Sequence, residues 1–319
     1  PETKFRKINN LIGWLLFSAA LVTYGLTVEP TASYWDAGEY ISTSAKLQVG
    51  HPPGAPFFQM MGAVFSLFAS NNESIAIAVN FLSVVSSAFV ILFLFWSTTL
   101  FLKKISKKNN FVNDTNILLS SSIGALAFTF SDSFWFNAVE TEVYALAMLF
   151  LSATFWCGLR WEKDFDNKRG DKWLLLICFL IGLSFGVHFM AILTIPAIGM
   201  IYFFKKYKKI TIKNFVLANI ISVSILLFIF KLLLPSTLSL FGQLEVFFVN
   251  SIGLPFNSGT IIAAFLIVFF FYKSLNYTRL KGMVQANTLI LCILFIFIGF
   301  SSWLMLPIRS NANTVINEN

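Results

Sequence analysis

Long, uninterrupted runs of apolar residues dominate this chain, and short polar segments separate them. Nine runs each come close to the ~20 residues that an α-helix needs to cross the hydrocarbon core of a bilayer. They fall at about 11–27, 75–102, 115–131, 139–159, 173–188, 190–204, 212–234, 258–272 and 284–306. Strands of an outer-membrane barrel would instead give ~10-residue segments of alternating polarity. The pattern predicts an all-α polytopic membrane protein, a bundle of about nine transmembrane helices.

Composition supports this fold class and narrows the function. The chain is 57% hydrophobic and 12% charged, with a mean hydropathy of +0.75. A soluble domain carries about 25% charged residues. The net charge of +8 does not indicate a nucleic-acid partner, because the basic residues lie in short loops between apolar runs. Three cysteines lie within apolar runs, at a spacing that suits neither a metal site nor a disulfide framework, so we expect them to pack as small apolar side chains.

The basic residues also predict an orientation. With a cytoplasmic N-terminus, the inner segments are 1–10, 103–114, 160–172, 205–213 and 273–283, and they hold 20 of the 23 basic residues. Only Lys46, Lys231 and Arg309 remain for the outer side. This asymmetry follows the positive-inside rule.

The same threading makes 28–74 one long outer loop. Its apolar stretch 57–70 has only 14 residues, which favours a short interfacial or re-entrant helix over a further span. No internal repeat or linker divides the chain, so 1–319 is predicted to be a single transmembrane domain. Because the chain starts at Pro and stops at Asn-Glu-Asn, we expect it to be the N-terminal part of a longer protein.

The outer loop carries ionisable residues next to the first apolar run, where such groups usually serve a function. Asp36 and Glu39 are three residues apart and would share one face of a helix. They could converge on one site, or Asp36 could be an N-cap with Glu39 completing a capping box. The two prolines after His51 exclude a helix and predict a rigid turn. His51 could also donate to an anionic group.

Further polar residues are predicted on the same outer side. Glu140 and Glu142 are two apart and would point about 200° from each other on one helix. We favour Glu142, with Tyr144 nearby, as the member that faces a site.

Two other outer residues have a structural and a functional interpretation. His188 follows Gly182 and Gly186, whose spacing favours close helix packing, and could be an interfacial hydrogen-bonding residue. Arg309 could anchor the last span at the interface, or its forked guanidinium could clamp a phosphate.

Five segments carry a resemblance to a known family. They are Trp-Asp-Ala-Gly-Glu-Tyr at 35–40, Gly-His-Pro-Pro-Gly-Ala-Pro at 50–56, Ala-Val-Glu-Thr-Glu-Val-Tyr at 138–144, Gly-Leu-Ser-Phe-Gly-Val-His at 182–188 and Leu-Pro-Ile-Arg-Ser at 306–310. Together they resemble the GT-C superfamily of membrane glycosyltransferases, and most nearly the protein O-mannosyltransferase-like proteins of glycosyltransferase family 117. The resemblance implies a GT-C-like bundle whose first outer loop holds the active site and short amphipathic helices.

The resemblance also implies a reaction. A sugar, mannose or a similar hexose, would pass from a polyprenyl-phosphate carrier to Ser or Thr hydroxyls of exported proteins, with inversion. Asp36 would be the general base, and His51 and Arg309 would stabilise the leaving phosphate. Glu39 would be the second catalytic residue, in support of Asp36. Glu39 and Glu142 would bind sugar or acceptor hydroxyls or position a cation, and Tyr144 and His188 would also bind substrate. No dedicated metal site is implied, although the carboxylates would suit Mg²⁺ or Mn²⁺.

The implied setting is a bacterial inner membrane, with the N-terminus cytoplasmic and the site on the periplasmic face. Partners would be membrane lipids, the lipid-linked sugar donor, an acceptor protein and other envelope membrane proteins. The alternative function is a non-catalytic membrane subunit that scaffolds an envelope or secretion complex. A transporter or flippase ranks lower, because neither inverted repeats nor ionisable groups near mid-membrane are visible.

Overall fold

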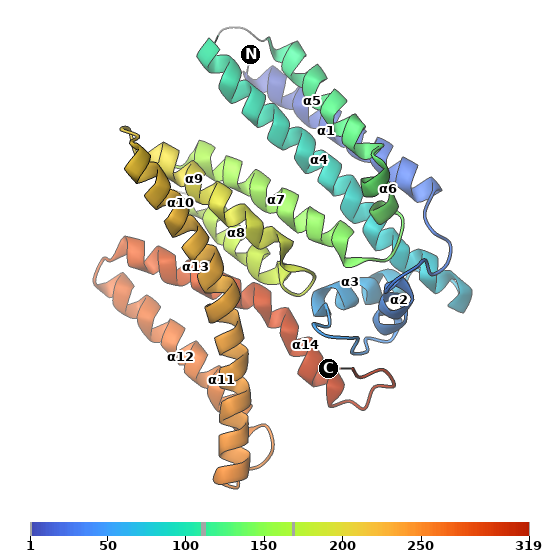
Figure 1. Ribbon diagram of the computed structural model, residues 1–319, viewed down its shortest axis with the longest axis vertical. Helices are drawn as coiled ribbons and strands as arrows, with labels where there is room; N and C mark the ends of the chain where they lie inside the picture. The colour runs from blue at the N-terminus through green and yellow to red at the C-terminus, as the bar shows by residue number, and fades with distance from the viewer. Residues whose placement is uncertain (1, 110–112, 168–169, 319) are drawn as a thin grey trace.

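The computed structural model describes residues 2–109, 113–167 and 170–318, and they form an array of helices (Figure 1). The α-helices are α1 (Glu2–Leu26), α2 (Ala37–Ala45), α3 (Pro56–Ser66), α4 (Ile75–Asn109), α5 (Asp114–Thr129), α6 (Asp132–Ala138), α7 (Val143–Asp164), α8 (Asp171–Ser184), α9 (Thr194–Lys206), α10 (Ile212–Leu227), α11 (Leu234–Val246), α12 (Ser258–Leu280), α13 (Val284–Phe300) and α14 (Met305–Ser310). Short 3₁₀ or π segments are Asn72–Ser74, Phe189–Leu193, Phe228–Leu233, Phe247–Ser251 and Ser301–Leu304. Within these ranges the β structure is a single bridge, Val49 to Asn317. The predicted all-α membrane fold is confirmed.

The number of spans differs from the prediction. Each of the nine apolar runs coincides with a helix, but seven helical segments of the described chain are long and apolar enough to cross a membrane. An eighth results if α5 and α6, bent by 67° at their junction, count as one span. Helix α8 has 14 residues, fewer than the ~20 that a full crossing requires. Apolar composition predicts which segments enter the lipid, but it does not determine the residue at which each helix ends.

One segment is longer than predicted. The helix that starts at Ile212 continues to Ser251, for 40 residues, instead of ending near residue 234. Pro235 lies at the start of α11 and follows the π segment Phe228–Leu233. Proline cannot donate its backbone hydrogen bond, and a local π-type turn lets the helix pass it.

Helices α4, α7, α8 and α13 form the central stack. Helix α4 packs against α1, α5 and α7, and α8 packs against both α7 and α13 (Figure 1). One buried cluster between these helices includes Cys157, Cys178 and Cys292. All three cysteines are free and buried, as expected for small apolar side chains.

Gly182 and Gly186 both lie too close to neighbouring segments to leave room for a Cβ. A Cβ on Gly182 would lie 2.0 Å from the carbonyl oxygen of Ile296 in α13, so only glycine allows α8 to approach so closely. A Cβ on Gly186 would lie 2.7 Å from Cβ of Phe57. The carbonyl of Gly186 accepts hydrogen bonds from the backbone N–H groups of Phe57 and Phe58 at 2.7 and 3.1 Å. The predicted role of this glycine pair in close packing is confirmed.

The loop 28–74 is therefore a structured unit that contains α2 and α3. Helix α3 has 11 residues and is too short to span a bilayer, which agrees with the interfacial or re-entrant helix predicted there. Figure 1 shows α2, α3 and α14 near one another, whereas the start of α1, the end of α4 and the start of α5 lie at the opposite end.

Candidate active site

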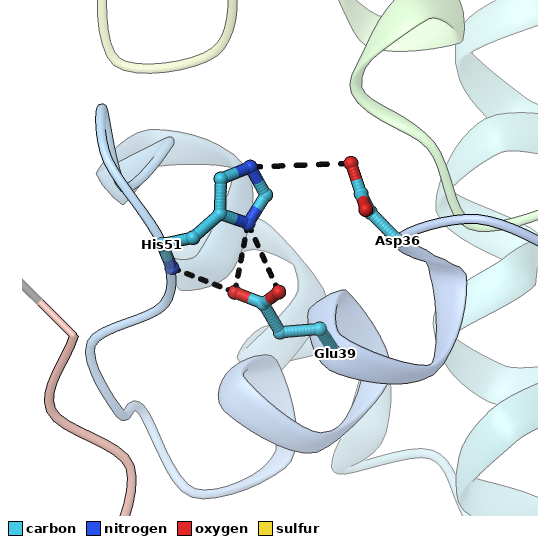
Figure 2. A group of neighbouring side chains, drawn as sticks. All are labelled: Asp36, Glu39 and His51. Carbon is cyan, nitrogen blue, oxygen red and sulfur yellow. Dashed lines mark hydrogen bonds and ion pairs between the residues drawn. The ribbon is translucent and has the colours of Figure 1, made fainter.

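Glu39 and His51 form the best-defined pair in the outer loop (Figure 2). The backbone N–H of His51 donates to Oε1 of Glu39 at 2.7 Å. The ring atom Nδ1 of His51 lies 3.0 Å from Oε1 and 2.9 Å from Oε2 of the same carboxylate. Because an ionised carboxylate only accepts hydrogen bonds, this geometry places a proton on Nδ1. Glu39 thus fixes both the turn and the orientation of the imidazole ring.

Asp36 lies on the other side of that ring. Its Oδ2 is 3.9 Å from Nε2 of His51, and its side chain is 54% exposed. The two carboxylates therefore converge on opposite edges of one imidazole, as their spacing in the sequence predicts. In contrast to Glu39, Asp36 keeps its carboxylate accessible to a ligand from solvent.

The capping-box interpretation of Asp36 is wrong. Asp36 occupies the N-cap position of α2, but its side chain makes no capping hydrogen bond. Its backbone has φ −85° and ψ −1°, whereas an N-cap residue that bonds the first turn is usually extended. The Glu39 side chain, which would complete the box, is bound to His51 instead.

The turn after His51 is held from two directions. The N–H of Gly54 donates to the carbonyl of His51 at 2.8 Å. Val49, two residues before His51, is held by the C-terminal segment. Its N–H donates to the carbonyl of Ile316 and its carbonyl accepts from the N–H of Glu318, both at 3.1 Å. These contacts confirm a non-helical turn and bring a second carboxylate-bearing segment near His51.

These surroundings shift the pKa of His51 upward. The hydrogen bond to Glu39 is the largest cause, and the negative charges of Glu39, Asp36 and Glu318 add to it against the opposing effect of burial. His51 therefore keeps its positive charge to a higher pH than an ordinary histidine.

Glu142 belongs to the same group of charges, although not on the helix that the sequence predicts. Residues 139–142 connect α6 to α7, and Glu142 is the N-cap residue of α7, so the expected 200° separation from Glu140 does not apply. Both carboxylates are buried, at 3% exposure for Glu140 and 6% for Glu142. Burial, followed by the charge of Asp36, raises the pKa of Glu142 to about 7. At neutral pH this side chain can act as a donor or an acceptor.

Tyr40 is the residue that the sequence interpretation missed. Its ring lies 6.0 Å from the His51 ring and is 8% exposed. Burial raises its pKa, and the charges of Glu142, Asp36 and Glu39 raise it further. Tyr40 follows Asp36 by four residues, and that helical spacing could have revealed it.

Tyr144 and His188 form a neighbouring pair, with ring centroids 5.7 Å apart. The His188 ring also stacks on Phe189 at 4.4 Å. Burial lowers the pKa of His188, and its Nδ1 is buried with no hydrogen-bond partner among the described residues. His188 is therefore a neutral imidazole at neutral pH, in contrast to His51.

Arg309 contacts the far end of α2. Its Nε donates to the carbonyl of Leu47 at 2.5 Å, and one terminal nitrogen donates to the carbonyl of Lys46 at 3.3 Å. The ten residues from Asp36 to Lys46 span about 15 Å along a helix. The structure thus uses Arg309 to hold the C-terminal end of α2, and its role toward a phosphate stays a prediction.

The residues around His51 could also hold a divalent cation. One ligand atom each from Asp36, Glu39 and His51 lie within 4.8 Å of one another. Carboxylate oxygens suit Mg²⁺ or Mn²⁺, and a histidine nitrogen extends the choice to transition metals. Two cavities elsewhere in the molecule, of about 410 and 660 Å³, are lined by other residues. The candidate site is an accessible cluster on the outer loop.

Comparison with known proteins identifies a matching family and related proteins. The family described as the Protein O-mannosyl-transferase TMEM260 N-terminal domain matches residues 36–211. The chain is 30% identical over 158 residues to Protein O-mannosyl-transferase tmem260 of Dictyostelium discoideum, which covers 49% of this chain and 18% of that protein. It is 27% identical over 175 residues to Protein O-mannosyl-transferase TMEM260 of Mus musculus, covering 53% and 22%.

The matched region thus spans only about a fifth of the length of these curated relatives. No solved structure matches the chain. The family match starts at Asp36 and includes Glu39, His51, Glu142 and His188. Because it covers more than half of the 319 residues, this multi-pass membrane protein belongs to the family of the Protein O-mannosyl-transferase TMEM260 N-terminal domain, as its sequence motifs predicted.

Proposed function

We propose that this chain carries the catalytic loop of a membrane protein O-mannosyltransferase, with Asp36 as the general base. The observation that carries the proposal is that the two carboxylates beside His51 differ in their contacts and exposure. Glu39 is occupied by three contacts to His51, whereas Asp36 is half exposed and makes no capping bond. An exposed carboxylate with a charged neighbour is suited to accept a proton from a ligand.

The proposed reaction is a single displacement. The acceptor Ser or Thr hydroxyl loses its proton to the Asp36 carboxylate as its oxygen attacks the anomeric carbon of the sugar. The bond from that carbon to the carrier phosphate breaks, and both of its electrons leave with the phosphate oxygen. Attack from the face opposite the phosphate inverts the anomeric centre. The donor in this scheme is a polyprenyl-phosphate-linked mannose or similar hexose.

His51 supports the step through charge. Its raised pKa favours the imidazolium form more than in an ordinary histidine, and positive charge fixed beside the leaving phosphate stabilises the negative charge that develops there. Glu142, with a pKa of about 7, and Tyr144 would bind hydroxyls of the sugar or the acceptor. In this scheme Arg309 acts on the phosphate only if a ligand draws it away from α2, and His188 contributes an uncharged hydrogen-bonding ring.

The relatives and the charge pattern support the setting of this reaction. Both curated relatives are named protein O-mannosyl-transferases. Because 20 of 23 basic residues fall on the side opposite the outer loop, the proposed site faces away from the cytoplasm. A bacterial inner membrane, with exported proteins as acceptors, fits this arrangement.

The test compares Asp36→Asn with Asp132→Asn in nanodiscs supplied with polyprenyl-phosphate mannose and a Ser/Thr-containing acceptor peptide. Asp132 is an exposed acid at the start of α6, outside the cluster. We expect Asp36→Asn to lose about 100-fold or more in transfer rate, since general-base catalysis typically contributes 10²–10⁴-fold, while Asp132→Asn stays near wild type. Equal activity of both variants would refute the catalytic assignment and favour a scaffolding role.

A further inference from the structure

A cationic cavity lies at the end of α7 opposite Glu142. It has a volume of about 660 Å³ and lies between α1, α4, α7 and α9. Six of its lining side chains are cationic, namely Arg6, Lys103, Lys104, Arg160, Lys163 and Lys205. Among the described lining residues, Glu162 is the one carboxylate. Ligand pockets are commonly ~300–1,000 Å³, so the volume suits a small anionic group.

The positive-inside rule alone does not account for this cavity. That rule places basic residues on inner loops, where water can surround them. Here all six cations lie on helices, and four different helices bring them around one hollow. Loop residues such as Lys208, Lys209 and Lys281 satisfy the topology rule without lining the cavity. The convergence is a property of the fold.

The cavity also contains unsatisfied polar atoms. Oδ1 of Asn9, Nε1 of Trp96 and Nε of Arg160 are buried and have no hydrogen-bond partner within the described chain. All three residues line this cavity. Buried polar groups in folded proteins are almost always paired. The two nitrogens, Nε1 of Trp96 and Nε of Arg160, are donors and therefore indicate a missing acceptor.

Arg160 is the best placed of the cations. Its guanidinium lies 5.8 Å from the ring of Trp156 and 5.3 Å from that of Trp173. These rings hold a planar fork whose geometry matches phosphate oxygens. Lys104 and Lys205, in contrast, already have partners, in Glu162 and Asp166.

The position of the cavity along α7 indicates which phosphate-bearing molecule could reach it. Glu142 and Arg160 lie at opposite ends of α7, and their separation of 18 positions corresponds to a helical rise of about 27 Å. The hydrocarbon core of a bilayer is about 30 Å thick. A helix with this rise, if it starts at one headgroup layer, brings Arg160 close to the opposite headgroup layer.

We propose that this cavity binds the phosphate headgroup of an anionic phospholipid, held by Arg160 and Arg6 on the face opposite the outer loop. Basic pockets between transmembrane helices on the cytoplasmic side typically accept such headgroups. The bound phosphate supplies the acceptor that Nε of Arg160 lacks and neutralises part of the excess positive charge. The site does not depend on the activity of the outer loop.

Native mass spectrometry of the purified protein tests the proposal. Phosphatidylglycerol, zwitterionic phosphatidylcholine and free inorganic phosphate are titrated against the wild type, Arg160→Gln and Lys281→Gln. Lys281→Gln removes the same charge at an exposed position outside the cavity. We expect the first phosphatidylglycerol to bind the wild type and Lys281→Gln alike, and Arg160→Gln about tenfold more weakly. Phosphatidylcholine should bind weakly to all three.

Two further variants keep the proposal testable if Arg160→Gln does not fold. Arg6→Gln changes an exposed position on α1 and should also weaken phosphatidylglycerol. Arg160→Lys keeps the charge and loses the fork, so an intermediate loss is expected. Equal weakening by Lys281→Gln would show non-specific attraction and overturn the proposal. Displacement of phosphatidylglycerol by millimolar inorganic phosphate would show that the ligand is a soluble anion, and would overturn it as well.

Discussion

The two ends of α7 use charge in opposite ways. At the end of α7 that begins with Glu142, the carboxylates of Asp36 and Glu39 lie against His51. The pKa of His51 and that of the nearby Glu142 are both raised. At the Arg160 end, guanidinium and ammonium groups surround a cavity and pack on aromatic rings. Arginine and lysine stay charged across physiological pH. The first end can therefore exchange protons during a reaction, whereas the second presents a constant positive charge.

The largest expected effect comes from a substitution that should destabilise the fold and so impair the sites at both ends of α7. Gly182→Ala places a methyl group against the α13 backbone, where a Cβ would lie 2.0 Å from the carbonyl of Ile296. Overpacking of this kind costs about 1–3 kcal/mol or more, so the midpoint of thermal unfolding should fall by several degrees. Transfer and lipid binding should fall with it.

Gly124→Ala is the matched control, because a Cβ there meets nothing within 4 Å. It should be neutral or slightly stabilising, since alanine favours a helix interior by about 0.5–1 kcal/mol over glycine. Equal midpoints for the two variants would contradict the close approach of α8 and α13.

A substitution of Glu39 should affect only the cluster around His51, at the Glu142 end of α7. Glu39→Gln keeps an oxygen for the His51 N–H but removes the negative charge, so the pKa of His51 should fall back toward its ordinary value. We expect transfer to fall about tenfold at neutral pH, as a loss of roughly 1.4 kcal/mol of charge stabilisation would give. Phosphatidylglycerol binding should not change. NMR titration of the histidine ring measures the shift, and an unchanged pKa of His51 would sink this account.

Glu142 should also give the stability of the folded chain a pH dependence. Its pKa in the folded chain is about 7, above the ordinary value of 4.5, so the folded state favours the protonated carboxyl. The stabilisation is complete below pH 4.5 and is lost as pH rises through 7. Wild type should therefore lose more stability than Glu142→Gln between pH 5 and 8, as thermal midpoints in nanodiscs would show. A parallel pH dependence in both proteins would assign the effect to another group.

Much of the fold could be predicted from the sequence. A long apolar run enters the lipid, and there its backbone polar groups must bond to one another, which a helix achieves. The lengths of α8 and of the helix through Pro235 could not be predicted, since packing against neighbours decides where a helix ends. For the site, the spacing of Asp36 and Glu39 correctly predicted convergence on one centre. It could not show that Glu39 binds His51 instead of capping α2, because that contact depends on the path of the turn.

The same limit applies to Glu142 and Arg309. Their residue types indicated a polar function, but the helical geometry assumed around Glu142 was wrong, because residues 139–142 form a connection. Arg309 meets carbonyls more than 260 positions earlier in the chain. Contacts over such separations follow from the whole fold and leave no local pattern.

The pairing of Val49 with residues 316 and 318 has a consequence for biosynthesis. A ribosome releases the outer loop long before it makes the segment that holds it, and the intervening helices must enter the membrane first. The pairing of Val49 with residues 316 and 318 can therefore form only after the helices between them have been made.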